Sequence, residues 1–528
     1  MLDKARARRI AIVGVALLAL LGAPVSAGAV PGFFPSVSMP VPHAWGAKPN
    51  LGYSQLSCSG LGDCTAIGAY TDASGRYLPA ADTEVSGHWS TPVALSLPPG
   101  AKPVVFVQGL TSISCPSAGN CTAVGELWFK ATPWQPVVAV ETAGTWGAVT
   151  TGLPLPAGTS LGGLDTVWCS HPTDCVAAGW AGTAKGPAHG FVDTETSGAW
   201  GASVVLPTPS SSQVHGAVST YPGSISCTSA AACVIVGGFG GPPEVSPTLG
   251  FATIESAGTW SAPTVFAPRG SAQVSLGSVD CAAPGSCVAG GVAGPTSQGQ
   301  VPYVVRLSAG HWRGTILRYR YASPLTWSGT INAVSCASTT SCVAVGAVDN
   351  GDAGLGNTAQ DGEFPAAYTL SGTTWSNAAL LAMPRSGGRR SGGAELDSIV
   401  CPVQGLCEST GVSSPAGSST QVAYPFDDRV LTRGADTEPF APTKLTAVAH
   451  TGSFVVRWGP PTSDGGSPIL SYRVIATSPH TPTLTCTTVA NSCQLRGARA
   501  RRTYVVKATA LNAAGLRGHF ARVIVTSK

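Results

Sequence analysis

Fourteen of the 16 cysteines form seven pairs with the spacing C-x5-C, and this spacing limits the chemistry they can do. A dithiol redox site is typically C-x-x-C, and a zinc site needs four soft ligands gathered together. Neither pattern fits seven identical pairs, so we expect each pair to be a disulfide closing a β-hairpin, worth about 2 kcal/mol in loop entropy. The pairs are Cys58/Cys64, Cys115/Cys121, Cys169/Cys175, Cys227/Cys233, Cys281/Cys287, Cys336/Cys342 and Cys401/Cys407.

The cysteine pairs mark a repeat whose successive units begin 54 to 65 residues apart. A tryptophan, most often preceded by a Gly-x turn, follows the second cysteine of six units. These residues are Trp89, Trp146, Trp200, Trp260, Trp312 and Trp375. A fixed period of this length predicts identical structural units that are stacked or arranged in a ring.

Each unit is predicted to contain four short strands, which in the second unit are 112–115, 121–125, 137–141 and 145–150. Seven such units predict an all-β fold, with residues 31–434 forming a seven-bladed β-propeller. A stacked solenoid is the alternative. The seventh unit has no tryptophan, whereas Trp45 precedes the first unit, so we expect the N-terminal segment to supply the outer strand of the last blade.

The repeat resembles secreted bacterial propellers of the sialidase (BNR, Asp-box) and kelch-like kinds, through the turn of Glu141-Thr-Ala-Gly-Thr-Trp146. The chain departs from the Asp box, because a Glu stands three residues before the glycine instead of an Asp two residues before it. This Glu recurs in four units, which favours a role in the turn over catalysis. The four residues are Glu84, Glu141, Glu195 and Glu255.

Residues 442–528 resemble a fibronectin type III domain, a β-sandwich of the immunoglobulin-like class. The resemblance rests on Val455-Val-Arg-Trp458, on Tyr504-Val-Val-Lys-Ala-Thr-Ala510 and on Asn512-Ala-Ala-Gly515. It implies that Trp458 is a core residue and Tyr504 the corner tyrosine. It also implies an eighth disulfide between Cys486 and Cys493, and a spacer or adhesive role.

The N-terminus has the layout of a secretory signal peptide over residues 1–27, with a basic start and an apolar stretch from Ile10 to Leu21. No longer apolar run follows, so we expect no transmembrane segment. The predicted location is secreted, either extracellular or at the cell surface, where disulfides form.

Charge is distributed unevenly between the two predicted domains, which are joined by a linker at 435–441. Residues 28–441 carry 15 Lys and Arg against 24 Asp and Glu, a net of −9. Residues 442–528 carry 11 Lys and Arg against one acid, a net of +10. The basic domain could bind an anionic cell-surface polymer or dock on the acidic propeller, and each domain could equally have acquired its surface independently.

Longer loops of the predicted propeller carry aromatic and basic residues that could bind a glycan or a protein. The alternative is that the tryptophans pack between blades. The candidates are Trp128, Trp134, Trp180, Arg318, Arg320, Tyr321 and Trp327. Asp349 and Asp352 open an acidic insertion that could bind calcium, the one cofactor hypothesis the sequence raises.

The search for catalytic motifs favours a binding protein over an enzyme. The G-x-S-x-G match at Gly158–Gly162 lies in a loop and not on a strand-to-helix turn. No zinc or phosphate-binding motif occurs, and no nucleic-acid partner is expected. We therefore expect a secreted, non-catalytic binding or adhesion protein. The alternatives are a structural surface protein and a carbohydrate-active hydrolase with acids from several blades, taken from Glu126, Asp165, Asp280, Asp349 and Asp361.

Overall fold

The computed structural model describes most of residues 51–431 and 439–528, and the short strands at 32–33 and 37–38. Within these ranges the description omits residues 61, 73–76, 86–87, 100, 102–108, 130–133, 211–218, 241–248, 269–270, 272, 295–299, 319–327, 350–362, 382–384, 387–388, 404–405, 416–423, 462–468, 489 and 513–516.

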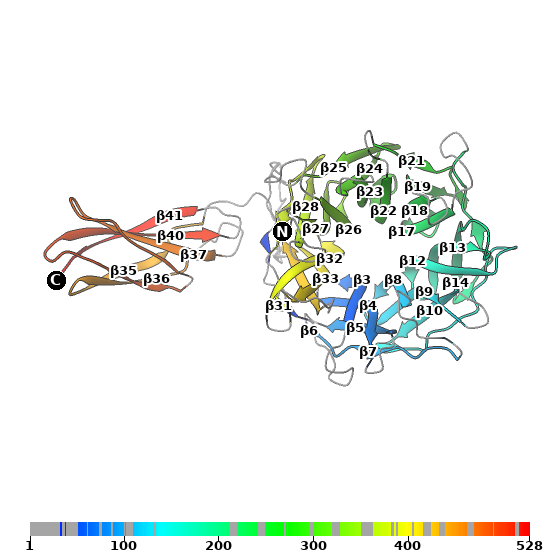
Figure 1. The fold of residues 1–528 in the computed structure, drawn as a ribbon, viewed down its shortest axis with the longest axis horizontal. Coiled ribbons are helices and arrows are strands. Elements are labelled where there is room, and N and C mark those ends of the chain that lie inside the picture. Colours follow the sequence, from blue (N-terminus) through cyan, green and yellow to red (C-terminus); the bar gives the residue numbers. More distant parts are fainter. Residues whose placement is uncertain are drawn as a thin grey trace, which may run out of the picture.

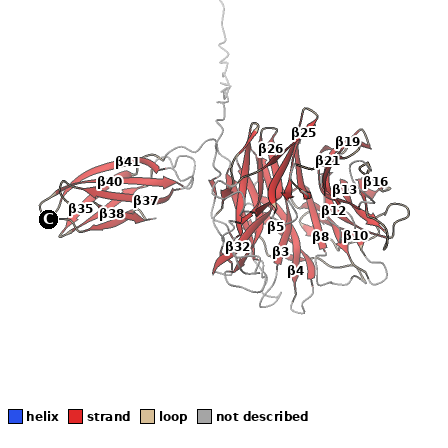
Figure 2. Ribbon diagram, turned by 45° about the horizontal axis from the view of Figure 1, so that its top comes forward, coloured by secondary structure: helices blue, strands red, loops and turns tan. Residues whose placement is uncertain are grey.

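The described residues form strands, turns and loops without a helix, which confirms the all-β prediction (Figures 1 and 2). Seven antiparallel sheets precede a β-sandwich, and we number them in chain order. Sheet 1 contains β3 (Leu51–Gly60), β4 (Asp63–Thr71), β5 (Tyr77–Val85), β6 (His88–Trp89) and β7 (Val93–Ala94). Sheet 2 contains β8 (Gly109–Ser117), β9 (Asn120–Leu127), β10 (Gln135–Thr142) and β11 (Thr145–Trp146). Sheet 3 contains β12 (Leu161–His171), β13 (Asp174–Gly182), β14 (His189–Thr196), β15 (Ala199–Trp200) and β16 (Val204–Val205).

The remaining four sheets repeat this pattern. Sheet 4 contains β17 (Ser219–Ser229), β18 (Ala232–Gly240), β19 (Leu249–Ser256), β20 (Thr259–Trp260) and β21 (Thr264–Phe266). Sheet 5 contains β22 (Gln273–Ala283), β23 (Ser286–Gly294), β24 (Val301–Ser308) and β25 (His311–Ile316). Sheet 6 contains β26 (Ser328–Ser338), β27 (Ser341–Asp349), β28 (Glu363–Ser371), β29 (Thr374–Trp375) and β30 (Ala379–Leu380). Sheet 7 contains β31 (Arg385–Ser386), β32 (Arg389–Val403), β33 (Leu406–Pro415) and β34 (Tyr424–Leu431), joined by β1 (Gly32–Phe33) and β2 (Val37–Ser38).

The sheets surround a common centre (Figure 1). The strand of each sheet that carries the first cysteine of its pair lies nearest this centre, and we call it the inner strand. The inner strands β3, β8, β12, β17, β22, β26 and β32 contact one another in this order, and β32 also contacts β3. No described sheet closes on itself as a barrel.

Side-chain acceptors join each inner strand to the next. Ser112 Oγ accepts a hydrogen bond from Val167 N at 3.1 Å, and Ser114 Oγ accepts one from Cys169 N at 2.9 Å. The same two positions recur along the chain, three residues and one residue before the cysteine. The other acceptors are Ser57 (from Cys115 N), Thr166 (Ile225 N), Ser224 (Val279 N), Ser226 (Cys281 N), Ser278 (Val334 N), Asp280 (Cys336 N), Ser335 (Cys401 N) and Ser398 (Leu56 N).

All seven C-x5-C pairs are disulfides, as predicted. The second cysteine of every pair is buried, with at most 3% of its surface exposed. Its sulfur therefore belongs to the packed interior of the sheets, and its role is structural. The bonds are Cys58–Cys64, Cys115–Cys121, Cys169–Cys175, Cys227–Cys233, Cys281–Cys287, Cys336–Cys342 and Cys401–Cys407.

The disulfides also influence how the sheets meet. In sheet 3, Cys169 lies directly opposite Cys175, with the two Cα atoms 4.0 Å apart. So close an approach is typical of a pair whose backbone groups do not bond to each other. The N–H of Cys169 therefore points out of its own ladder and meets Ser114 of the preceding sheet.

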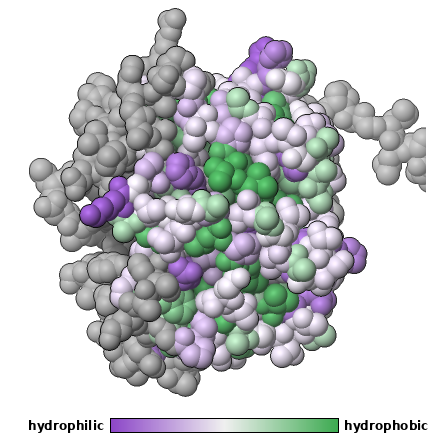
Figure 3. Space-filling view, turned by 90° about the vertical axis from the view of Figure 1, so that its right-hand side faces the viewer, coloured by the Kyte–Doolittle hydropathy of each residue, from purple (hydrophilic) through white to green (hydrophobic). Residues whose placement is uncertain are grey.

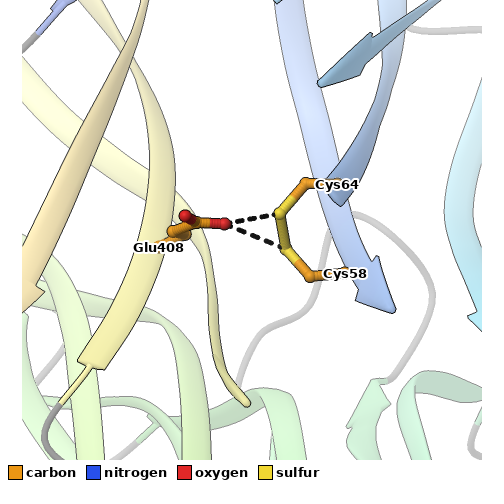
Figure 4. A group of neighbouring side chains, drawn as sticks. All are labelled: Cys58, Cys64 and Glu408. Atoms are coloured by element: carbon orange, nitrogen blue, oxygen red, sulfur yellow. Dashed lines mark hydrogen bonds between the residues drawn. A yellow bond between two sulfur atoms is a disulfide. The ribbon is translucent and has the colours of Figure 1, made fainter. Parts of the chain in front are cut away.

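The junction between sheets 7 and 1 has a further contact. The Glu408 carboxylate on β33 accepts a hydrogen bond from Gly62 N at 2.9 Å, and its Oε2 lies 2.7 Å from Cys64 Sγ (Figure 4). Cys58, Cys64 and Glu408 thus form the kind of cluster that can hold a metal. The two sulfurs are bonded to each other, so neither can act as a thiolate ligand, and we assign the contact to the packing of the two sheets.

Sheet 7 receives strands from both ends of the repeat region. Gly32 and Phe33 of β1 pair with Leu431 and Val430 of β34, and β2 pairs with the same strand. Trp45, which the sequence places in this outer strand, lies outside the described residues.

The C-terminal region is a sandwich of two sheets. One contains β35 (Thr443–His450), β36 (Ser453–Gly459) and β39 (Ser492–Arg496). The other contains β38 (Leu484–Thr488), β37 (Ile469–Thr477), β40 (Thr503–Asn512) and β41 (Arg517–Thr526). Trp458 and Tyr504 are buried in its core, as predicted, and Tyr504 Oη accepts a hydrogen bond from Arg499 N at 3.0 Å.

The eighth disulfide is absent from the structure, which corrects the sequence expectation: Cys486 and Cys493 are free thiols. Cys486 lies on β38 and Cys493 on β39, and these strands belong to different sheets of the sandwich. The C-x6-C spacing therefore spans a crossover between sheets and not a hairpin. Burial raises the pKa of the Cys493 thiol, and its hydrogen bond with Cys486 raises it further.

Within the described residues, no helix is long and apolar enough to cross a membrane. The side of the molecule in Figure 3 carries apolar patches among residues of intermediate hydropathy, with few strongly hydrophilic ones. This surface agrees with a chain in which only 11% of residues are charged.

The hydrogen bond from Leu56 N to Ser398 Oγ, at 3.0 Å, joins the last inner strand to the first. We expect Ser398→Ala to lower the free energy of unfolding by about 1–3 kcal/mol, because a buried N–H loses its acceptor. Ser59→Ala removes an exposed hydroxyl and serves as the control, with an expected change within about 0.5 kcal/mol. Urea denaturation measures both. Equal midpoints for the two variants would contradict the role of this bond.

The disulfide assignment predicts two free thiols per chain in denatured, unreduced protein, Cys486 and Cys493. Thiol titration followed by peptide mapping measures this. Labelling at any C-x5-C pair would contradict the seven hairpin disulfides, and no labelling at all would show that the sandwich cysteines are oxidised.

Candidate functional site

A cavity of about 480 Å³ lies at the centre of the seven sheets, and residues of all seven inner strands line it. Most of the lining side chains are serine, threonine or small apolar residues. Two acids, Asp165 and Asp280, also belong to the lining. The sequence had named both as candidate acids.

Where a disulfide contributes to the wall of this cavity, only its first cysteine lines it. The first cysteines of sheets 2 to 5 belong to the lining, namely Cys115, Cys169, Cys227 and Cys281. The second cysteines are buried behind them and do not line it. The seven second cysteines are therefore residues of the scaffold and not ligand-contacting groups of this site, namely Cys64, Cys121, Cys175, Cys233, Cys287, Cys342 and Cys407.

Each inner strand carries a β-bulge four residues before its first cysteine, at the level of the cavity. The extra residue in each strand is Ser54, Thr111, Asp165, Gly223, Gly277, Asn332 or Asp397. Bulges re-aim a side chain and are common beside functional sites. Thr111 Oγ1 donates to Leu164 O at 2.9 Å, and Asn332 Nδ2 donates to Leu396 O at 3.0 Å, so bulge side chains reach the following sheet.

Two of the seven bulge residues are aspartates with strongly perturbed pKa values. Burial raises the pKa of Asp165 well above its usual range, and the charge of Glu126 raises it further. Burial also raises the pKa of Asp397, with a further contribution from Glu395. Oδ2 of Asp165 is buried without a hydrogen-bond partner among the described residues. Burial and the charge of Glu126 thus both act against ionisation of Asp165, and its Oδ2 can still bond a ligand.

Glu126, at the end of β9 in sheet 2, is the second acid of this group. Burial raises its pKa to about 7, opposed by a hydrogen bond from Trp180 Nε1 to Glu126 Oε2 at 3.0 Å. The Glu126 side chain lies over Gly163, where any larger residue would collide with its carboxylate. The glycine thus allows an acid of sheet 2 to lie against sheet 3.

Aromatic side chains complete the group. Trp180 on β13 and Tyr221 on β17 meet edge to face, with ring centroids 6.4 Å apart, and Tyr221 is 43% exposed. We call Glu126, Asp165, Trp180 and Tyr221 the acidic–aromatic cluster. It combines two interacting carboxyl groups with two rings at the junction of sheets 2, 3 and 4, which suits a ligand that offers both hydroxyl groups and an apolar face.

The structure places the other predicted residues differently. Asp280 accepts hydrogen bonds from Cys336 N, Ser335 Oγ and Ser226 Oγ, and so belongs to the bonding between sheets 4, 5 and 6. Trp128 and Trp134 are half-buried, and Trp134 O accepts a hydrogen bond from Gly162 N. Arg318 is exposed after β25 in sheet 5.

Several predicted residues cannot be placed. Arg320, Tyr321, Trp327, Asp352 and Asp361 lie outside the described residues. The same holds for the side chain of Asp349, at the end of β27.

Tyr221 was missed in the sequence. Aligning the seven units on their first cysteine would have found it, because it stands six residues before Cys227, where the other units have no aromatic residue. Those positions are Gly52, Gly109, Gly163, Ser275, Thr330 and Glu395.

The raised pKa of Glu126 predicts a pH dependence of stability. The unfolded chain releases this proton near pH 4.5 and the folded protein near pH 7, so the folded state binds more protons in between. The unfolding free energy therefore falls as the pH rises through this window. We expect Glu126→Gln to flatten that fall in urea titrations at pH 5 and pH 8, because glutamine does not titrate.

Trp180→Phe provides the opposite arm. This variant removes the N–H that stabilises the ionised carboxylate, so the pKa of Glu126 in the folded protein should rise further. The decrease in unfolding free energy should then extend to higher pH. A pH profile unchanged in both variants would contradict the assignment.

Comparison with known proteins identifies the sandwich. Residues 440–527 match the fibronectin type III domain family, and no curated protein matches the chain. Among solved structures, the FN5 domain of Drosophila Lar is 20% identical with a TM-score of 0.15, and the match covers 17% of this chain and 98% of that one. A fibronectin type III domain of human collagen XX is 24% identical with a TM-score of 0.15, covering 17% and 94%. The twitchin kinase region from C. elegans is 21% identical with a TM-score of 0.16, covering 17% of each chain. The family match identifies residues 440–527 as a fibronectin type III domain.

Proposed function

We propose that residues 31–434 form a seven-bladed β-propeller in which each of the seven sheets is one blade. Three observations support this proposal. The inner strands contact one another around a common centre, side-chain acceptors bridge every junction, and one cavity is lined by all seven strands. The pairing of β1 and β2 with β34 supports closure of the last blade by the N-terminal segment.

We propose that the protein is an extracellular binding or adhesion protein, and that the propeller recognises a glycan at the acidic–aromatic cluster. The observation that carries this proposal is the hydrogen bond from Trp180 to Glu126, with Asp165 beside them at the central cavity. Sugar rings present hydroxyl groups to carboxyls and C–H faces to aromatic rings. The seven disulfides fit an oxidising, extracellular compartment. The fibronectin type III domain would serve as a spacer or tether.

The basic C-terminal domain suggests what the tether contacts. Eleven Lys and Arg and a single acid in residues 442–528 favour an anionic cell-surface polymer as a second partner. The acidic propeller of the same chain is the competing partner.

Glycoside hydrolysis is the second candidate function, and one observation favours it. A carboxyl group with a pKa of about 7 is suited to act as a general acid, and Glu126 has that pKa. A glycosidase also needs an ionised second carboxylate as nucleophile or base. Burial raises the pKa of Asp165, the adjacent acid, which makes it less suited to that role, and binding is the preferred proposal.

The binding proposal predicts that Trp180→Ala and Tyr221→Ala weaken glycan binding by about tenfold each, the upper range for one aromatic contact. Arg313→Ala, which removes an exposed side chain on β25 of sheet 5, is the control and should bind as the parent does. A glycan array selects the ligand, and titration calorimetry measures the affinities. A blank array would refute the glycan proposal, and release of reducing ends by the parent but not by Glu126→Gln would favour the hydrolase.

A further inference from the structure

A second cavity, of about 320 Å³, lies between sheets 1 and 2, apart from the central one. Its lining includes Glu84 and Val85 at the end of β5, and Glu141 and Trp146 of the β10–β11 hairpin. Most other lining residues are small or apolar, and none is Lys, Arg or His. The cavity therefore combines three carboxyl groups, from Asp63, Glu84 and Glu141, with small and apolar side chains, and none of its lining residues supplies a positive charge.

Glu141 is the key residue of this cavity. It is 1% exposed, and its Oε2 is buried without a hydrogen-bond partner among the described residues. Burial raises the pKa of Glu141 above its usual range. An unpartnered buried acceptor is costly, so a bound group that donates to it would be strongly favoured.

Trp146 is the second element. It stands directly opposite Glu141 on the neighbouring strand, and it lines the same cavity. Its Nε1 is buried without a partner among the described residues. An indole ring beside a carboxylate is a favourable setting for an organic cation, because the ring face attracts positive charge.

The Glu–Trp pair is not needed to form the hairpin. Sheets 5 and 6 place Leu307 and Leu370 opposite Trp312 and Trp375, in the position of Glu141. An apolar side chain therefore suffices for the packing there. Sheets 1 to 4 share this acid, and what distinguishes Glu84 and Glu141 among them is that both line one cavity.

We propose that this cavity binds an organic ammonium group, with Glu141 and Glu84 neutralising the charge and Trp146 contacting the cation. The ligand class is an alkylammonium ion, in which a charged nitrogen carries an apolar body. A calcium ion would use the carboxyl oxygens of Asp63, Glu84 and Glu141 but not the Trp146 ring, and it requires six to eight oxygen ligands.

The experiment titrates the full chain with butylammonium chloride and with tetramethylammonium chloride, followed by calorimetry and by tryptophan fluorescence. Sodium chloride and 1-butanol are the ionic-strength and neutral controls. We expect saturable binding of an ammonium ion and none of butanol. We expect Glu141→Gln to weaken it at least about tenfold, the usual result of removing one partner of a buried charge pair.

Two variants guard against misfolding and against a non-specific effect of charge. Glu141→Leu copies the residue of sheets 5 and 6, so it should fold and lose ammonium binding. Glu195→Gln changes the equivalent acid of sheet 3, which does not line this cavity, and should bind as the parent does. Trp180→Ala, at the central site, should also bind normally, which separates this proposal from the glycan one.

Three results would overturn the proposal. They are the absence of ammonium binding, equal binding by the parent and by Glu141→Leu, and a crystal structure grown with the ammonium salt that holds only ordered water in the cavity.

Discussion

Around its cysteine, the inner strand of each sheet pairs with a strand on one side only, and the arrangement of the seven sheets depends on how the other edge is satisfied. Its free N–H groups face the preceding sheet, where hydroxyls or, at one position, the Asp280 carboxylate accept them. Exposed strand edges invite pairing with other chains, and buried N–H groups without acceptors are costly. One set of serine, threonine and aspartate side chains therefore resolves both problems and fixes the spacing of neighbouring sheets.

Much of this architecture could be predicted from the sequence. The cysteine period predicted seven units and their disulfides, and the recurring Ser-Ile-Ser-Cys at 112–115 and 224–227 contains the acceptors themselves. Their role could not be inferred, because it depends on contacts between strands about 55 residues apart. Cys486 and Cys493 were misassigned for a related reason: spacing alone does not tell a hairpin from a crossover between two sheets.

The sequence identified most residues of the candidate site but not which of them lie together in space. Glu126, Asp165 and Trp180 were all named from the sequence, yet under separate hypotheses, as acids of a hydrolase and as a ligand-binding aromatic. Trp180 and Glu126 are 54 residues apart, and only the contact between sheets 2 and 3 joins them. Asp280 looked equivalent to Asp165, but it stands one residue before its cysteine, where acceptors bond the next sheet, while Asp165 stands at the bulge. A shift of three residues within the repeat separates an acid of the scaffold from an acid of the site.

The pairing of β1 with β34 has a mechanical consequence. The strands are antiparallel, and Gly32 lies opposite Leu431, so the chain enters and leaves sheet 7 at the same end of this pair. Tension between the N-terminal side and the C-terminal domain would therefore break the hydrogen bonds of this pair one after another. It would not load all of them at once, as shear along the strands does. Since β1 is only two residues long, such a load would release this strand before it reached the pairing of β2 with β34.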